Sequence, residues 1–139
     1  MNLELAEMTR MRIRDEGGAT SLVQTVLVAP AILFTLMLIV QFGLLFHAKN
    51  IAEQAAQEGA AEARAFNGSK AAARESTLEF LDSLGPRMLT NRSVVVDRTA
   101  QTATVTVQGT VLALVPGVNL GVRETASAPR ERYVPVAQR

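Results

Sequence analysis

Cysteine and histidine, two residue types on which many catalytic and metal sites depend, are absent or nearly absent from this chain. The sequence has no cysteine and a single histidine, His47, with nothing near it in sequence to complete a site. It contains no nucleophile–base pair and no metal-ligand cluster, and Gly117 and Gly121 match no phosphate-binding motif. These residue types and spacings predict a protein that is not an enzyme, with no cofactor, no metal and no small-molecule substrate.

Two amide side chains, together with Thr25, are the main polar interruptions of a long apolar segment. Gln24 and Gln41 lie within residues 22–46, which are otherwise almost entirely apolar. A bare amide facing lipid is unfavourable, so the two glutamines predict hydrogen bonds to a neighbouring helix. The alternative is that a long span simply tolerates them.

A row of small residues follows the apolar segment. Ala52, Ala56 and Ala60 recur every four residues and therefore share one face of a helix. Such a row lets a second helix approach closely, although an alanine-rich segment also produces one by chance. Glu58 and Glu62 predict either a solvated face or two carboxylates that await a basic partner.

The apolar segment is long enough to cross a membrane. Residues 17–48 contain no Asp, Glu, Lys or Arg, and a bilayer core of about 30 Å needs about 20 apolar residues. A buried core helix is the alternative, but about 90 other residues could hardly bury such a helix on every side. A secretory signal would have a shorter apolar region, of about 7–15 residues. The segment therefore predicts a transmembrane helix that stays in the mature protein.

The basic residues on either side predict the orientation of this helix. Arg10, Arg12 and Arg14 precede the span, whereas Lys49 is the basic residue that shortly follows it. The positive-inside rule then places the N-terminus in the cytoplasm and exports the remainder. The expected location is the cytoplasmic membrane, crossed once.

Helix signals continue beyond the span. Residues 48–65 are rich in alanine, which favours one continuous helix over about residues 21–66, and Pro30 is expected to kink or loosen it. Gly68 is expected to end that helix. Ser69 is placed to cap a second helix over residues 70–84, in which three leucines share a face: Leu78, Leu81 and Leu84.

The pattern then changes to the two-residue period of strands. Residues 94–96 are a β-branched run, and valine or alanine alternates with threonine over residues 102–107. Residues 97–101 are the expected turn, residues 111–115 continue the strand or begin another, and residues 122–128 are a third, edge strand. The fold class is therefore α+β, with a long N-terminal transmembrane helix, a short helix and a small antiparallel sheet.

The expected organisation follows the same signals. Residues 1–19 form a cytoplasmic leader or tail, 20–66 the transmembrane and extended helix, 67–130 a small extracytoplasmic α+β region, and 131–139 a C-terminal tail. The 14 basic and 13 acidic residues give a net charge of +1, which offers no field for a phosphate backbone and argues against nucleic-acid binding. Apolar residues make up 48% and aromatic ones 4%, and the surplus falls in the span and in the alanine-rich helix.

Three stretches of the sequence form a recognisable set: GGATSLVQTVLVAPAIL, VQFGLLFHAKNIAEQAAQEGAAEARA and RETASAPRERY, at residues 17–33, 40–65 and 123–133. Together they resemble the TadE-like family, minor pseudopilins of tight-adherence pili with a type IV pilin-like build. The resemblance implies a cell-surface role in a pilus or its assembly, with partners in the membrane and among other pilin subunits. Possible helix–helix contacts are then Gln24, Pro30, Gln41, Ala52, Ala56 and Ala60.

The resemblance also implies processing by a prepilin peptidase. The implied cleavage region comprises Gly17, Gly18, Ala19 and Thr20, and Gln24 stands where the family commonly has a glutamate. An amide cannot neutralise the amine of a neighbouring subunit, so a second interpretation stays open. In that interpretation the protein is an uncleaved single-pass membrane adaptor or sensor that does not polymerise.

Overall fold

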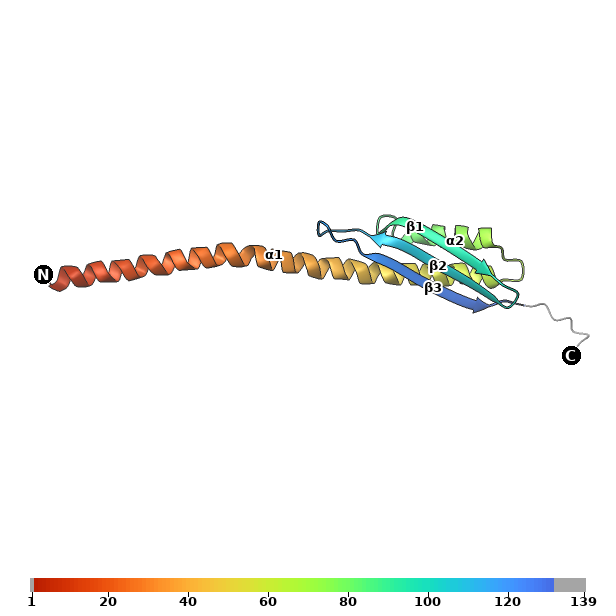
Figure 1. The fold of residues 1–139 in the computed structure, drawn as a ribbon, viewed down its shortest axis with the longest axis horizontal. Coiled ribbons are helices and arrows are strands. Elements are labelled where there is room, and N and C mark those ends of the chain that lie inside the picture. The colour runs from red at the N-terminus through yellow and green to blue at the C-terminus, as the bar shows by residue number, and fades with distance from the viewer. Residues whose placement is uncertain (1, 132–139) are drawn as a thin grey trace, which may run out of the picture. The chain divides into compact units, whose positions relative to one another are not determined.

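The computed structural model describes the backbone of residues 2–131 and the side chains of residues 22–131. The chain divides into two compact units, Met1–Ile39 and Val40–Arg139, called here the N-terminal and C-terminal units. The predicted α+β fold is confirmed, with five elements in the following order along the chain (Figure 1): α1 (Asn2–Arg64), α2 (Lys70–Leu84), β1 (Leu89–Arg98), β2 (Thr102–Val111) and β3 (Gly121–Pro129).

Helix α1 is one continuous helix of 63 residues that runs from one unit into the other. It begins at Asn2 rather than near Ser21, because residues 3–14 are mostly strong helix formers and contain no proline. Pro30 does not end the helix, and the helical backbone continues on both sides of it.

The end of α1 is fixed by a glycine and by hydrogen bonds from distant segments. Gly68 donates its N–H to the carbonyl oxygen of Ala65 at 3.0 Å, and a Cβ at Gly68 would collide with the carbonyl oxygen of Glu62. The Arg98 side chain also donates to the Ala65 carbonyl, at 2.9 Å. The last carbonyls of a helix lack partners within it, so these bonds satisfy groups that would otherwise be exposed or unpaired.

Helix α2 follows the predicted boundaries. The Ser69 hydroxyl accepts a hydrogen bond from the Ala72 N–H at 3.0 Å, and the Gly85 N–H closes the other end on the carbonyl of Leu81. The predicted leucine face of α2 is only partly buried, since Leu84 is 51% exposed. The buried row has four-residue spacing instead and comprises Ala73, Thr77 and Leu81.

The three strands form one antiparallel sheet in the order β1-β2-β3. β1 is longer than the predicted run of residues 94–96, and its pairing shifts between Thr90 and Ser93, where Asn91 has a φ of 50°. β2 ends at Val111, so the predicted continuation to residue 115 is a loop instead. The Thr99 hydroxyl accepts from two backbone N–H groups in the β1–β2 turn, which explains a tight turn without an Asn-Gly pair.

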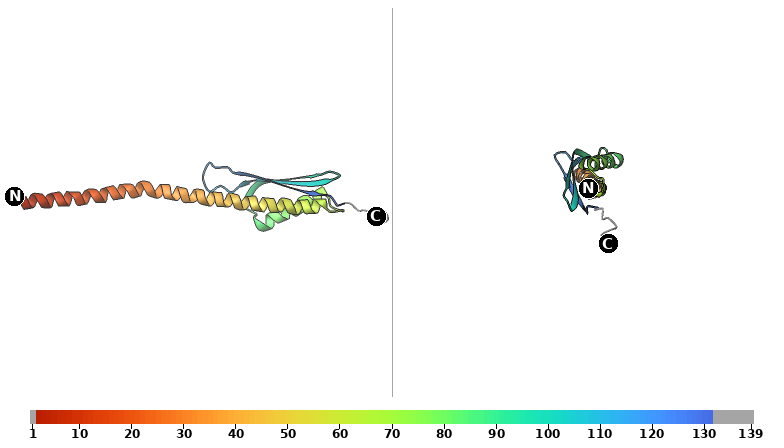
Figure 2. Two further views of the ribbon diagram at one scale, coloured as in Figure 1. Left: turned by 90° about the horizontal axis from the view of Figure 1, so that it is seen from below. Right: turned by 90° about the vertical axis from the view of Figure 1, so that its right-hand side faces the viewer.

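The sheet lies over α2 and the second half of α1 within the C-terminal unit (Figure 2). Its buried face carries Ala103, Val105 and Val107 of β2, all 0% exposed. Opposite them, the second half of α1 supplies mainly alanines, which allow the helix to lie close beneath the sheet. The buried α1 alanines are Ala48, Ala52, Ala55, Ala56, Ala60 and Ala63.

Replacement of Ser69 by alanine should destabilise the C-terminal unit by about 1 kcal/mol, because the Ala72 N–H loses its capping partner. Chemical denaturation monitored by circular dichroism measures this change. Ser83→Ala is the matched control, since the Ser83 hydroxyl is exposed and bonds within its own helix to the Phe80 carbonyl. An equal loss in both variants would contradict a capping role for Ser69.

Candidate functional site

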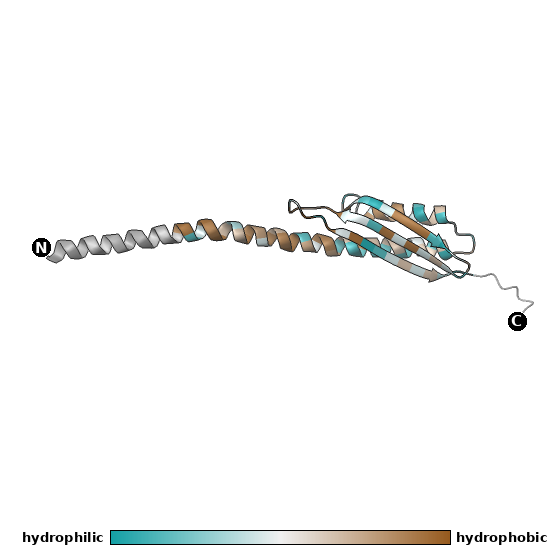
Figure 3. Cartoon of the chain, in the orientation of Figure 1, coloured by the Kyte–Doolittle hydropathy of each residue, from teal (hydrophilic) through white to brown (hydrophobic). Residues whose placement is uncertain are grey.

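The most prominent surface of the N-terminal unit is apolar. Leu22, Leu27 and Leu33 are 70%, 71% and 64% exposed, and most of the other large apolar side chains of residues 22–39 are exposed as well. Figure 3 shows this part of α1 coloured mainly as hydrophobic, with a few hydrophilic or neutral interruptions. Among the described residues, one helix is long and apolar enough to cross a membrane, by length and composition. Such a surface is compatible with single-pass membrane anchoring.

A shallow groove marks one face of this apolar helix. It is lined by residues at three- and four-residue spacing, which are neighbours on the helix surface: Gln24, Thr25, Val28, Ala29 and Ile32. Ala29 contributes a small side chain to this lining, and the exposed Gln24 lies at the N-terminal end of the set. A groove with this lining fits the ridge of a second helix, and Gln24 can hydrogen-bond across the contact.

Gln41 has a different environment from Gln24. It is 1% exposed, and its side-chain Nε2 donates to the carbonyl oxygen of Leu112 at 3.2 Å. Its Oε1 accepts from the N–H groups of Leu114 and Val115, at 2.7 and 3.4 Å. The amide of Gln41 therefore ties α1 to the loop between β2 and β3 of the same chain.

The alanine row also has partners within the chain. Ala52 and Ala56 are 0% exposed and Ala60 is 3% exposed, all in the core beneath the sheet. Gly59 continues the close approach, since a Cβ there would meet the Thr77 hydroxyl of α2 and lie 3.2 Å from a methyl of Val105 in β2. The small residues of this segment thus let one helix pack closely against both α2 and the sheet.

These two features, an exposed apolar helix and its small-residue continuation, fall within one region of sequence similarity. The family model of the TadE-like protein matches residues 19–61. This segment is TadE-like. The resemblance predicted from the sequence is confirmed over these residues, and the third stretch of that resemblance, residues 123–133, lies outside the match. No curated protein and no solved structure shows a match to this chain.

The implied cleavage region lies at the start of the TadE-like segment. The backbone at Gly17, Gly18, Ala19 and Thr20 is part of α1, and the side chains of these residues lie outside the described ones. Peptidase processing within residues 17–20 therefore stays a prediction. The predicted C-terminal tail is not described either, since residues 132–139 lie outside the described residues.

The charged residues of the TadE-like helix face solvent in this chain. Glu53, Glu58 and His47 are exposed, as is Glu62 just beyond the matched segment. Among residues 22–131, no group of three histidine, cysteine or acidic side chains is arranged to hold a metal ion.

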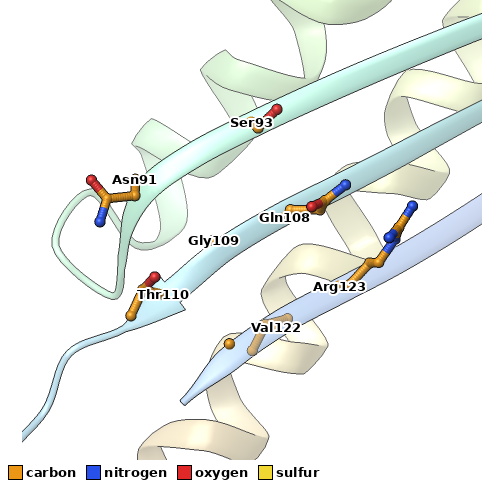
Figure 4. Close-up of a pocket in the computed structure, with 8 residues that line it drawn as sticks. Asn91, Ser93, Gln108, Gly109, Thr110, Val122 and Arg123 are labelled. Carbon is orange, nitrogen blue, oxygen red and sulfur yellow. The ribbon is translucent and has the colours of Figure 1, made fainter. Parts of the chain in front are cut away.

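The outer face of the sheet carries a shallow polar depression beside the irregular part of β1 (Figure 4). Ser93, Gln108 and Arg123 form a cross-strand row there, since Gln108 pairs with the other two in the sheet register. Further along, hydroxyls pair across β2 and β3, for example Thr106 with Thr125 at 3.0 Å. Sequence analysis had not singled out this face, although the alternating threonines of residues 102–106 are its signal.

Proposed function

We propose that the protein is a minor pilin-like component of a tight-adherence pilus, or of its assembly, anchored in the membrane by α1. The proposal rests on the overlap of two features along the chain. The segment that matches the family model, residues 19–61, contains the exposed apolar surface of residues 22–39. A helix built in this way can occupy lipid first and pack with other pilin helices later.

In this proposal the N-terminus faces the cytoplasm and the C-terminal unit is presented outside the cytoplasmic membrane or on an extracellular fibre. Support comes from Arg10, Arg12 and Arg14, which precede the span. The C-terminal unit has its own core and adds a polar, hydroxyl-bearing sheet face, as suits a region in water.

The proposed contact face for other pilin helices is the groove at Gln24. A prepilin peptidase would cut within residues 17–20, and cleavage after Ala19 would make Gln24 the fifth residue of the mature chain. An amide at this depth adds about 1 kcal/mol when it finds a hydrogen-bonding partner on a neighbouring helix. Pro30 lies on a different face of the same helix, close to the groove in sequence.

The second candidate function is an uncleaved single-pass membrane adaptor or sensor. Gln24 is the observation that favours it, because a glutamine cannot neutralise the terminal amine of a neighbouring pilin. The two candidates differ in the N-terminus of the mature chain and in the neighbours of the groove.

Photo-crosslinking combined with N-terminal mass spectrometry distinguishes the candidates. A photoreactive amino acid at Val28, in the groove, should give adducts with pilin subunits in cells that assemble the pilus, and the mature chain should begin at Ala19 or Thr20. The matched control is the same substitution at Val23. This valine is 61% exposed and lies about 140° around the helix axis from Val28, at 3.6 residues per turn.

Three outcomes are informative. Adducts at Val28 that exceed those at Val23, together with a shortened N-terminus, support the pilin-like function. A chain that keeps Met1 and gives no pilin adducts at either position supports the adaptor. A chain that washes out of membranes with carbonate contradicts both, because both require the anchor.

A further inference from the structure

The loop between β2 and β3 is apolar and partly exposed. Residues 112–120 read LALVPGVNL, without a charged residue, and the chain carries no charge from residue 99 to residue 122. Leu112 and Leu114 are 44% and 41% exposed. Exposed apolar residues indicate an interaction surface where they form part of a larger patch, so the neighbours of these leucines decide what they can do.

The loop is an ordered element that is held against α1. Its carbonyl at Leu112 and its N–H groups at Leu114 and Val115 all bond to the buried amide of Gln41. At its two ends the Val111 N–H donates to the Leu120 carbonyl at 2.9 Å, and the Leu112 N–H donates to the Met88 carbonyl at 3.2 Å. The exposed leucines therefore keep a fixed place next to residue 41 of the helix.

The helix itself is apolar at this level. Val40 and Phe42, on either side of Gln41 in sequence, are 52% and 53% exposed, and Phe46 is 64% exposed one turn further on. The first charged residue after the span is Lys49, about 12 Å along the axis from Gln41 at 1.5 Å per residue. The end of the C-terminal unit nearest the span thus presents apolar side chains from both the helix and the loop.

The length of a membrane crossing indicates the depth of this end. A bilayer core of about 30 Å takes up about 20 residues of the longer apolar segment 22–46. When the hydrocarbon begins at Leu22, residues 22–40 fill about 28 Å of it as a helix, and Gln41 lies at the headgroup boundary together with the loop that it bonds.

We propose that the loop of residues 112–120 inserts Leu112 and Leu114 into the lipid interface, as a second attachment of the C-terminal unit to the membrane. This inference rests on the proposed membrane anchoring by α1. It goes beyond that anchoring because it assigns a lipid-contacting surface to a segment that follows the span by more than 60 residues.

Depth-dependent quenching in vesicles tests the proposal on the full-length chain. The sequence has no cysteine, so Leu114→Cys or Leu112→Cys introduces a single site for an environment-sensitive fluorophore. In phosphatidylcholine–phosphatidylglycerol vesicles, the label should be quenched most by a lipid nitroxide near the headgroup boundary, within the about 5–10 Å that interfacial segments reach.

Two labelled controls make the result specific. Val95→Cys labels a valine that is 45% exposed on the outer sheet face. Its partner Thr106 lies five residues along β2 from the loop, or about 17 Å. Its label should stay accessible to an aqueous quencher. Leu33→Cys labels the middle of the span, and its label should respond to quenchers placed deep in the hydrocarbon.

The outcomes separate this inference from the proposed function. Deep quenching at Leu33 with aqueous exposure at both loop positions overturns the inference and leaves the anchor intact. Absence of lipid quenching at Leu33 overturns the anchor, and the inference with it. Loop labels shielded from both lipid and water, increasingly so at higher protein-to-lipid ratios, indicate contact with a second copy and also overturn it.

Discussion

Replacement of Gln41 by leucine is expected to release the loop of residues 112–120 and to destabilise the C-terminal unit by about 2–4 kcal/mol. Leucine has a similar volume but cannot bond the Leu112 carbonyl or the Leu114 N–H. A fully buried backbone group left without a partner costs about 1–3 kcal/mol; the Val115 N–H is buried, and the Leu112 carbonyl and the Leu114 N–H are partly buried. The replacement removes three hydrogen bonds that converge on one side chain, and the backbone bonds that remain at Val111 and Leu112 hold only the ends of the loop.

The expected change is largest at the loop amides. The N–H groups of Leu114 and Val115 should exchange with solvent deuterium at least about tenfold faster in the variant, because a tenfold change corresponds to about 1.4 kcal/mol. Hydrogen exchange with mass spectrometry resolves this segment from the strands. Denaturant unfolding then measures the effect on the unit as a whole.

Gln57→Leu is the matched control for this experiment. Gln57 is on the same helix, is exposed, and bonds through Nε2 to the Glu53 carboxylate at 3.3 Å. Its replacement should change the free energy of unfolding by less than about 0.5 kcal/mol. Equal exchange rates in the Gln41 variant and the native chain would show that water replaces the amide and that the loop holds itself in place.

The elements that the sequence predicted correctly are those whose signals are local. The cap at Ser69 depends on residues within one helical turn, and the buried strand depends on alternation over residues 102–107. The predicted start of α1, near residue 21, was wrong because the helix-forming residues before the span contain no signal that would separate them from it. β1 begins earlier than its valine run because pairing with β2 decides its length.

Tertiary partners were not predictable in the same way. The sequence indicated that Gln41 needs a hydrogen-bonding partner, but Leu112 is 71 residues away and no local pattern points to it. The alanine row indicated the close approach of another helix. In the structure Ala52 and Ala56 instead lie in the core of the C-terminal unit, beneath the sheet. The groove at Gln24 is the place where a contact with another helix stays a prediction.

Replacement of Gly59 by valine is expected to have the second large effect, a loss of about 3 kcal/mol in the free energy of unfolding of the C-terminal unit. A first side-chain carbon at Gly59 already collides with the Thr77 hydroxyl, which is fully buried and bonded to the Ala73 carbonyl at 2.7 Å. The same carbon would lie 3.2 Å from a methyl of Val105 in β2. Overpacking of this kind costs about 1–3 kcal/mol, and valine adds two further methyl groups to the collision.

Gly43→Val separates this packing effect from helix propensity. Gly43 lies on the same helix, and a Cβ there meets no atom within 4 Å, so valine should leave the stability unchanged or raise it by a few tenths of a kcal/mol. Denaturation of both full-length variants in detergent provides the comparison. A large loss at Gly59 alone would mean that the small residues of the TadE-like segment are required for packing of α1 against α2 and the sheet. Similar stability in the two variants would contradict that role and favour a contact with another subunit instead.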